Sequence, residues 1–313
     1  MTPDSAVLVA IVSAFCFAVA EMFTRNALRF STPITASILS IAGQFILLTF
    51  LIALTGKFSS LHWEGVLWFL LAGFMNPFLF VAFYFVGIQR IGVARSAPIK
   101  GTAPIYAVIF AAGVLGERFS GVQYLGIAMV VGGIIFISAE GWAGERRAGS
   151  DEPEGGSAGG EGGSGPATGR TRKLDFLFPL LAGVSGGVAS VLFKLSMQKL
   201  PSPMVGVWLG TVVALILFPI LAFFFPKEQR YRASRRAYPW LIGNGIAISA
   251  AMYTLILSVG LGEVAIAFTL VQTSPLLVIG MSAIFLRKLE RVTPRIIFGA
   301  ILTVSGGVLV SLL

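Results

Sequence analysis

Charged residues are scarce in this sequence. Asp, Glu, Lys and Arg make up 12% of its 313 residues, whereas hydrophobic residues make up 56%. One water-soluble core could not hide that much apolar surface, so the composition excludes an ordinary soluble globular protein. Most of the chain is therefore expected to lie in lipid.

Histidine and cysteine are nearly absent. The single cysteine, Cys16, can form no disulfide within the chain. The single histidine, His62, leaves no histidine cluster for a transition metal and no second base for catalysis at Ser185 in GVSGG, 183–187. We interpret that motif as a small-residue packing stripe. No Walker phosphate-binding loop is present, so no cofactor and no metal are expected.

Long apolar runs recur along almost the whole chain. Each is long enough to cross a hydrocarbon core of about 30 Å as a helix, and alternating strand patterns are absent. The ten runs lie near 5–24, 34–55, 64–88, 93–115, 121–139, 175–196, 204–225, 238–258, 263–286 and 294–313. The sequence therefore predicts an all-α polytopic membrane protein with ten transmembrane helices.

The composition changes abruptly between the fifth and sixth runs. Residues 140–173 are rich in Gly, Ser and Glu and poor in apolar residues, which is typical of a disordered linker. The linker separates a five-helix segment at 1–139 from a second at 174–313. Five runs on each side favour a duplication.

Aligning the two segments pairs landmarks that chance rarely matches. The pairs are Thr102 with Thr273, Pro104 with Pro275, Glu117-Arg118 with Glu290-Arg291, Ser120 with Thr293, Gly126 with Gly299 and Arg25 with Lys194. Ser120 and Gln123 also have the spacing of a capping box at the start of the fifth helix. The sequence thus predicts two five-helix repeats.

The basic residues indicate how the repeats are oriented. An odd number of helices in each repeat makes the second enter the membrane inverted. If Arg25 and Lys100 are counted with the nearest loops, every Lys and Arg lies on the side of the linker except Lys57, Arg118, Lys194 and Lys199. The positive-inside rule then places the linker in the cytoplasm and both termini outside the plasma or inner membrane. Because these bases flank spans, lipid headgroups explain them better than nucleic acid, which is not expected as a partner.

These features resemble the paired domains of the EamA group in the drug/metabolite transporter superfamily. The resemblance is carried by Pro104 or Pro275, an apolar half-helix, and then LGERFSGVQYLGIAMVVGGIIF or LERVTPRIIFGAILTVSGGVLV. It implies ten helices, no ATP motor, and movement of small metabolites, commonly amino acids or related compounds outward. Eukaryotic relatives are usually drawn with cytoplasmic termini, whereas the charge count here places the termini outside.

Lys100 is a cation within the fourth apolar run. A charge at the centre of a spanning helix costs about 2.5–3.5 kcal/mol on insertion scales, so it needs a partner, a wet cavity or access to the headgroups. Two interpretations stay open. In one the long side chain reaches the membrane interface, and in the other its ammonium faces a cavity. Pro98 and Pro104 favour the cavity, because they loosen this helix as a hinge, and Pro275 does the same in the second repeat.

Other polar residues are candidates for the substrate pathway. Glu21 and Arg25 lie four residues apart on one helix face, either as a structural ion pair or as a functional pair in which Glu21 carries a proton. Lys194 is either interfacial or functional. The uncharged candidates on the middle helices are Asn76, Tyr84, Tyr253, Gln272 and Thr273.

The predicted function is secondary transport of small metabolites by two inverted halves that open alternately. The expected partners are a small-molecule substrate, the lipid bilayer and, as a candidate coupling ion, the proton. A membrane-embedded enzyme is disfavoured by the missing catalytic partners. A non-transporting scaffold or receptor is disfavoured by the inverted duplication, and the oligomeric state stays open.

Overall fold

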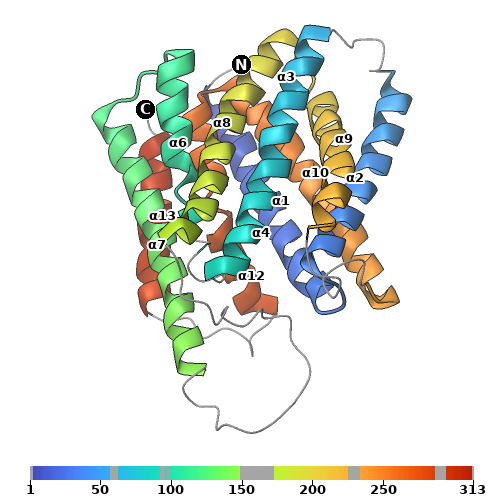
Figure 1. Ribbon diagram of the computed structural model, residues 1–313. Coiled ribbons are helices and arrows are strands. Elements are labelled where there is room, and N and C mark those ends of the chain that lie inside the picture. The colour runs from blue at the N-terminus through green and yellow to red at the C-terminus, as the bar shows by residue number, and fades with distance from the viewer. Residues whose placement is uncertain are drawn as a thin grey trace, which may run out of the picture.

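The computed structural model is a bundle of helices (Figure 1). It describes residues 3–56, 63–91, 96, 99–148, 173–224, 233–285 and 294–311. Within these ranges the only extended pairing is an isolated bridge between Ser31 and Ala233. The prediction of an all-α protein is confirmed for this part of the chain.

The helices divide at the linker. The first half contains α1 (Pro3–Leu28), α2 (Pro33–Thr55), α3 (Trp63–Gly73), the π-helical segment η2 (Phe74–Leu79), α4 (Phe80–Ile91), α6 (Ala103–Phe110), η3 (Ala111–Leu115) and α7 (Gly121–Ala148). The second half contains η4 (Lys173–Phe176), α8 (Leu177–Lys199), α9 (Pro203–Ala222), η6 (Arg235–Ala237), α10 (Tyr238–Leu261), α11 (Val264–Val271), α12 (Ser274–Phe285) and α13 (Pro294–Ser311).

Six helical segments are long and apolar enough to cross a membrane. They are Ser5–Leu28, Pro33–Thr55, Trp63–Ile91, Leu174–Lys199, Pro203–Ala222 and Arg235–Leu261. The remaining four predicted spans correspond to shorter apolar helices at Ala103–Leu115, Gly121–Phe136, Val264–Val278 and Ile301–Val310. The structure therefore supports an integral membrane protein with several spanning helices, and the count of ten stays a prediction.

One end of the bundle gathers the connections that flank the linker. Ser31, after α1, pairs with Ala233, before α10. Arg90, near the end of α4, lies 3.4 Å from the Asp175 carboxylate, just before α8. In Figure 1, α7 extends down to this same end before the chain enters the linker. We call it the linker end.

The opposite end contains both chain termini (Figure 1), and we call it the terminus end. Here Lys199 Nζ, at the close of α8, lies 3.2 Å from Glu64 Oε2, at the start of α3. Glu64 follows the second helix of the first half, whereas Ala233 at the linker end follows the second helix of the second half. Equivalent connections of the two halves thus lie at opposite ends of the bundle.

The helix pairs are exchanged between the halves. The first helix of the first half, α1, packs mainly on α10, the third of the second half, and α8 packs in the same way on α3 and α4. The second helices, α2 and α9, pack on each other, as do the fifth helices, α7 and α13. This reciprocal pattern is that of a pseudo-two-fold relation.

Glycines set the close approach of α7 to α13. A Cβ on Gly126 would lie 2.7 Å from the Gly306 carbonyl oxygen, so a larger residue would push the helices apart. At the start of α7, Ser120 N donates to Gln123 Oε1 at 2.8 Å, and Gln123 N donates to Ser120 Oγ at 3.3 Å. The predicted capping box is confirmed.

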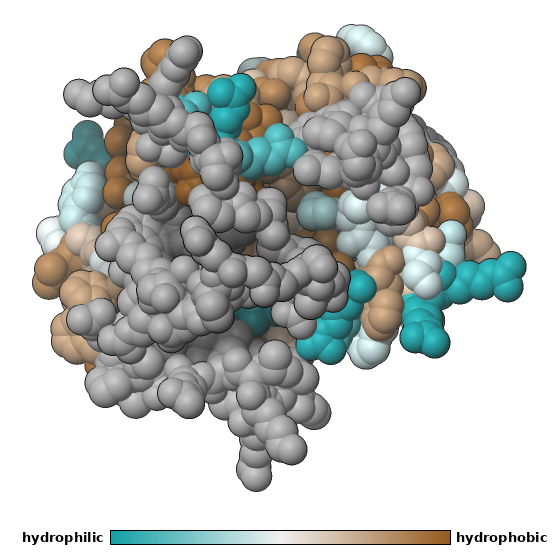
Figure 2. Space-filling model, turned by 60° about the horizontal axis from the view of Figure 1, so that its bottom comes forward, coloured by the Kyte–Doolittle hydropathy of each residue, from teal (hydrophilic) through white to brown (hydrophobic). Residues whose placement is uncertain are grey.

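The linker end is the more hydrophilic part of the surface in view in Figure 2, where apolar side chains cover much of the flanks. Arg29, Arg235 and Arg236 are exposed at this end.

Candidate functional site

Lys100 lies against two aromatic rings of α4. Its Nζ is 4.2 Å from the centroid of the Tyr84 ring and 5.3 Å from that of Phe80. The rings are four residues apart and so share one face of α4. Among the described residues Lys100 forms no ion pair and no hydrogen bond, and these cation–π contacts stabilise its ammonium.

Glu21, on α1, lies near Lys100 and Tyr84. Its carboxylate lies close enough for its charge to act on both Lys100 and Tyr84. The Glu21 side chain is nevertheless 56% exposed. The geometry therefore brings the Glu21 side chain of α1 near Tyr84 and Lys100.

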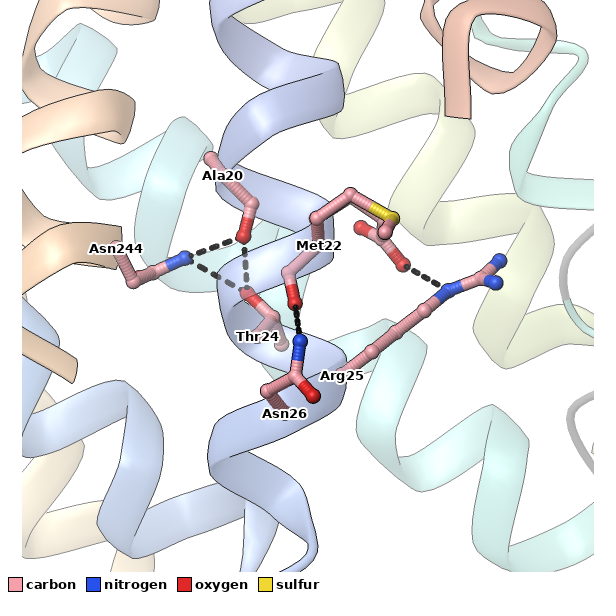
Figure 3. A network of polar contacts seen from close by, with 7 residues as sticks. Ala20, Met22, Thr24, Arg25, Asn26 and Asn244 are labelled. Atoms are coloured by element: carbon pink, nitrogen blue, oxygen red, sulfur yellow. Dashed lines mark hydrogen bonds and ion pairs between the residues drawn. The ribbon is translucent and has the colours of Figure 1, made fainter. Parts of the chain in front are cut away.

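Arg25 completes this group on α1. Its Nε lies 4.0 Å from Glu21 Oε1, and its side chain is 46% exposed (Figure 3). An exposed i,i+4 pair of this kind contributes only about 0.3–0.5 kcal/mol to stability. The pair is therefore too weak to hold Glu21 away from a solute.

The seam between α1 and α10 fixes the orientation of the Glu21 face. Asn244 Nδ2 donates to the Ala20 carbonyl at 2.8 Å and to Thr24 Oγ1 at 2.7 Å (Figure 3). Thr24 Oγ1 in turn donates to the Ala20 carbonyl at 2.9 Å. Asn244 is buried, and sequence reasoning missed it because a lone asparagine in an apolar run carries no periodic signal.

We expect replacement of Asn244 by Val to lower the thermal unfolding midpoint in detergent. Interhelical hydrogen bonds in membrane proteins average about 0.6 kcal/mol, up to about 1.7 kcal/mol, and Asn244 makes two. Thr254→Val is the matched control on α10, because the Thr254 hydroxyl bonds only carbonyls of its own helix. Equal unfolding midpoints for the two variants would show that the Asn244 hydrogen bonds add nothing to the stability of the protein.

Both fourth helices are interrupted close to Pro104 and Pro275, whose role as hinges stays a prediction. A turn at 101–102 precedes α6, and a turn at 272–273 separates α11 from α12. Thr102 Oγ1 donates to the Ile99 carbonyl at 2.6 Å, and Thr273 Oγ1 donates to the Leu270 carbonyl at 2.7 Å. The same threonine closes the same turn in each half, which supports the repeat alignment. Pro98 lies outside the described residues.

The remaining uncharged candidates lie elsewhere. Asn76 has non-helical backbone angles, φ −145° and ψ 116°, within η2 and marks the kink that Pro77 introduces. Tyr253 packs against the main apolar core from α10. Gln272 forms the C-cap of α11 through its backbone N–H. Within the described part of the chain none of these three residues contacts Lys100, so their place on a pathway stays a prediction.

Lys194 is not beside Lys100 but at the terminus end. Its Nζ donates to the Gly262 carbonyl at 2.6 Å and lies 3.5 Å from the Gly260 carbonyl. Glu117, from the first half, accepts a hydrogen bond from Val264 N at 3.0 Å in the same region. The sequence marked Glu117 only as a landmark of the repeat, because nothing in its own segment indicates a partner 147 residues away.

The glycine stripe on α8 packs as predicted. A Cβ on Gly187 would lie 2.5 Å from Tyr106 Cβ and 2.7 Å from Ala107 N on α6. Ser185 is buried, and its hydroxyl donates to the Ala182 carbonyl at 2.9 Å. This geometry is that of a helix-packing stripe, with the serine hydroxyl bonded to its own helix.

Comparison with known proteins supports the repeats. The model of the EamA-like transporter family matches residues 4–139 and 174–312. No curated protein matches the chain. A solved structure titled "Crystal structure of protein" is similar over 98% of this chain and 96% of that chain, with a TM-score of 0.76 and 17% sequence identity. At that identity the likeness shows a shared fold alone.

Proposed function

Because the chain belongs to the EamA-like transporter family, we propose that it is a secondary active transporter that carries small polar or amphipathic metabolites, such as amino acids, outward across the cell membrane. Lys100 carries this proposal. Its ammonium has aromatic neighbours, and no carboxylate is bonded to it among the described residues. That arrangement suits the carboxylate of a solute.

Glu21 and Arg25 extend the proposed site. Glu21 offers a negative charge that would attract the amino group of a zwitterionic solute or would carry a coupling proton. The rings of Phe80 and Tyr84 offer apolar surface beside Lys100. A few charged groups in a mostly apolar space are what an amphipathic metabolite requires.

The proposed mechanism is alternating access between two inverted five-helix halves. Support comes from the equivalent connections at opposite ends of the bundle and from the reciprocal helix pairs. The interrupted fourth helices add to it, because discontinuous helices line the sites of many such transporters. We further propose ten spans, with the linker in the cytoplasm and the termini outside, from the distribution of basic residues.

A labelled-metabolite panel tests the proposed function. Purified protein in lipid vesicles should accumulate at least one acidic or zwitterionic metabolite above the level of empty vesicles, with and without an imposed proton gradient. Failure of every member of a broad panel under both conditions would contradict transport. A gradient-dependent difference would identify the proton as the coupling ion.

For a substrate found in this way, we expect Glu21→Gln to remove the pH dependence of uptake. A glutamine keeps the size of the side chain but neither gains nor loses a proton between pH 5 and 8, so a proton step at Glu21 would disappear. Glu64→Gln is the control, because Glu64 is an exposed carboxylate paired with Lys199 at the terminus end. A pH profile unchanged by Glu21→Gln would assign the proton step to another group.

A further inference from the structure

The turn between α10 and α11 is held by side chains from both halves. Lys194 on α8 donates to the Gly262 carbonyl at 2.6 Å, and Glu117 Oε1 accepts from Val264 N at 3.0 Å. Glu117 belongs to the first half, whereas the turn and Lys194 belong to the second. The contact therefore joins the halves at the terminus end.

The first turn of α11 receives its cap from the other half. Glu263 occupies the N-cap position with an extended backbone, φ −72° and ψ 135°, but its side chain makes no capping hydrogen bond. Glu117 supplies the carboxylate instead, where the positive end of the helix dipole favours an anion. Separation of the halves would leave the Val264 N–H without this acceptor.

Described side chains pack closely around this turn at the terminus end. Ser258 Oγ donates to the Ala6 carbonyl at 2.7 Å and joins α10 to α1 beside the turn. Ser258, Val259 and Val264 have no exposed surface, in contrast to the 56% exposure of Glu21. The structure thus has the packing expected of a state closed at the terminus end.

The cluster carries an excess negative charge. Glu117 Oε2 and Glu263 Oε2 are both buried and accept no hydrogen bond among the described residues. The charges of both carboxylates act on Lys194, the one ammonium with them. The helices that contact α11 are α1, α6, α8, α10 and α13. The charged neighbour of Glu117 in its own segment, Arg118, is exposed, and Lys199 at the end of α8 pairs with Glu64.

Glu263 is the member of the cluster that binds a proton most readily. Burial raises the pKa of its carboxyl, the Glu117 carboxylate raises it further, and Lys194 lowers it in part. A buried carboxyl oxygen without a donor is stabilised by its own proton, which also cancels the excess charge.

We propose that Glu117, Glu263 and Lys194 form a proton-binding latch that holds the terminus end closed. The latch rests on the alternating-access mechanism proposed above. When the terminus end opens, water reaches both carboxylates and the preference of Glu263 for a proton falls. The closed state therefore binds the proton more tightly, so acidification favours closure and alkaline pH favours opening.

Spin labels at the terminus end test the latch without a substrate. Arg118, next to Glu117, and Gln198, one turn beyond Lys194, are both exposed. Arg118→Cys and Gln198→Cys are introduced together after Cys16→Ala removes the native thiol. Double electron–electron resonance on the labelled protein in lipid nanodiscs then measures the distance between them from pH 5 to pH 9. We expect a single short distance at acidic pH and a growing longer-distance population toward alkaline pH.

Substitutions then assign the response to individual groups. Glu263→Gln mimics the protonated carboxyl and should keep the short distance at every pH. Glu117→Ala and Lys194→Met should show the longer distance at every pH, and Lys194→Arg should restore the parent behaviour. Lys199→Gln, which breaks the neighbouring exposed pair, should behave like the parent.

Two results would overturn the latch. One is a parent distance that does not change with pH; the other is a Glu263→Gln variant that responds to pH as the parent does. Both can be obtained even if Glu117→Ala or Lys194→Met does not fold. Because no solute is present, pH-dependent opening in a protein that transports no metabolite would contradict the proposed function and leave the latch intact.

Discussion

Replacement of Lys100 by Met is expected to reduce kcat/KM for uptake of an acidic substrate by about 10-fold to 100-fold. A hydrogen bond to a charged group contributes about 1.5–3 kcal/mol, and each ~1.4 kcal/mol corresponds to a factor of ten. Met keeps the length and apolar stem of lysine, so it can still pack over Phe80 and Tyr84. The measurement is initial uptake into vesicles that contain equal amounts of folded protein.

The control for this substitution is Lys199→Met. Lys199 is also a lysine near a helix end, but it is 55% exposed and pairs with Glu64 at the surface. Its loss should leave uptake within about twofold, as expected for an exposed pair worth roughly 0–1 kcal/mol. Unchanged kinetics for Lys100→Met would instead support the alternative that the Lys100 side chain reaches the membrane interface and does not bind substrate.

Replacement of Gly187 by Ala is expected to destabilise the bundle. The new Cβ would lie 2.5 Å from Tyr106 Cβ and 2.7 Å from Ala107 N, so α6 and α8 must separate. Overpacking of this kind costs about 1–3 kcal/mol. The thermal unfolding midpoint in one detergent, followed by circular dichroism, should fall, and Gly187→Leu should yield no folded monomer by size-exclusion chromatography.

Gly43→Ala on α2 is the matched control. A Cβ at Gly43 would meet no atom within 4 Å, and Ala favours a helix over Gly by about 1 kcal/mol. Its midpoint should be unchanged or higher. If Gly187→Ala unfolded at the same temperature as Gly43→Ala, close packing at the α8 stripe would not contribute to stability.

Much of the fold follows from local and periodic signals in the sequence. The apolar runs predict the helices because every backbone group in lipid needs a partner within its own segment. Paired landmarks predict the duplication, and the equivalent turns at Thr102 and Thr273 have nearly the same hydrogen bond. Ser120 and Gln123 were predictable as a capping box because their spacing alone determines the contact.

The site was predictable only in part. Lys100, Glu21 and Tyr84 stand out as polar groups in apolar runs, yet no spacing indicates that α1, α4 and the fourth helix bring them together. The bond from Val264 N to Glu117 and the bonds made by Asn244 join segments more than 140 residues apart. Such contacts depend on how the halves pack, which periodicity within one helix does not encode.

The length of some helices also differed from expectation. The fourth and ninth apolar runs predict continuous spanning helices. In the structure the turns at 101–102 and 272–273 divide them into short helices. The prolines predict where each helix loses a backbone hydrogen bond. The length of each break depends on the neighbouring helices, because they satisfy the freed backbone groups. The breaks place Lys100 at the end of a helical segment rather than in its middle.

The central claim is that the second five-helix half crosses the membrane inverted relative to the first. Labelling with a membrane-impermeant maleimide tests it most directly, on the variants Thr55→Cys at the end of α2 and Phe224→Cys after α9, each with Cys16→Ala. Both positions are exposed and follow the second helix of their half. The account predicts that intact cells label Thr55→Cys only, and that Phe224→Cys reacts only after the membrane is opened. Labelling of both positions from the same face would contradict it.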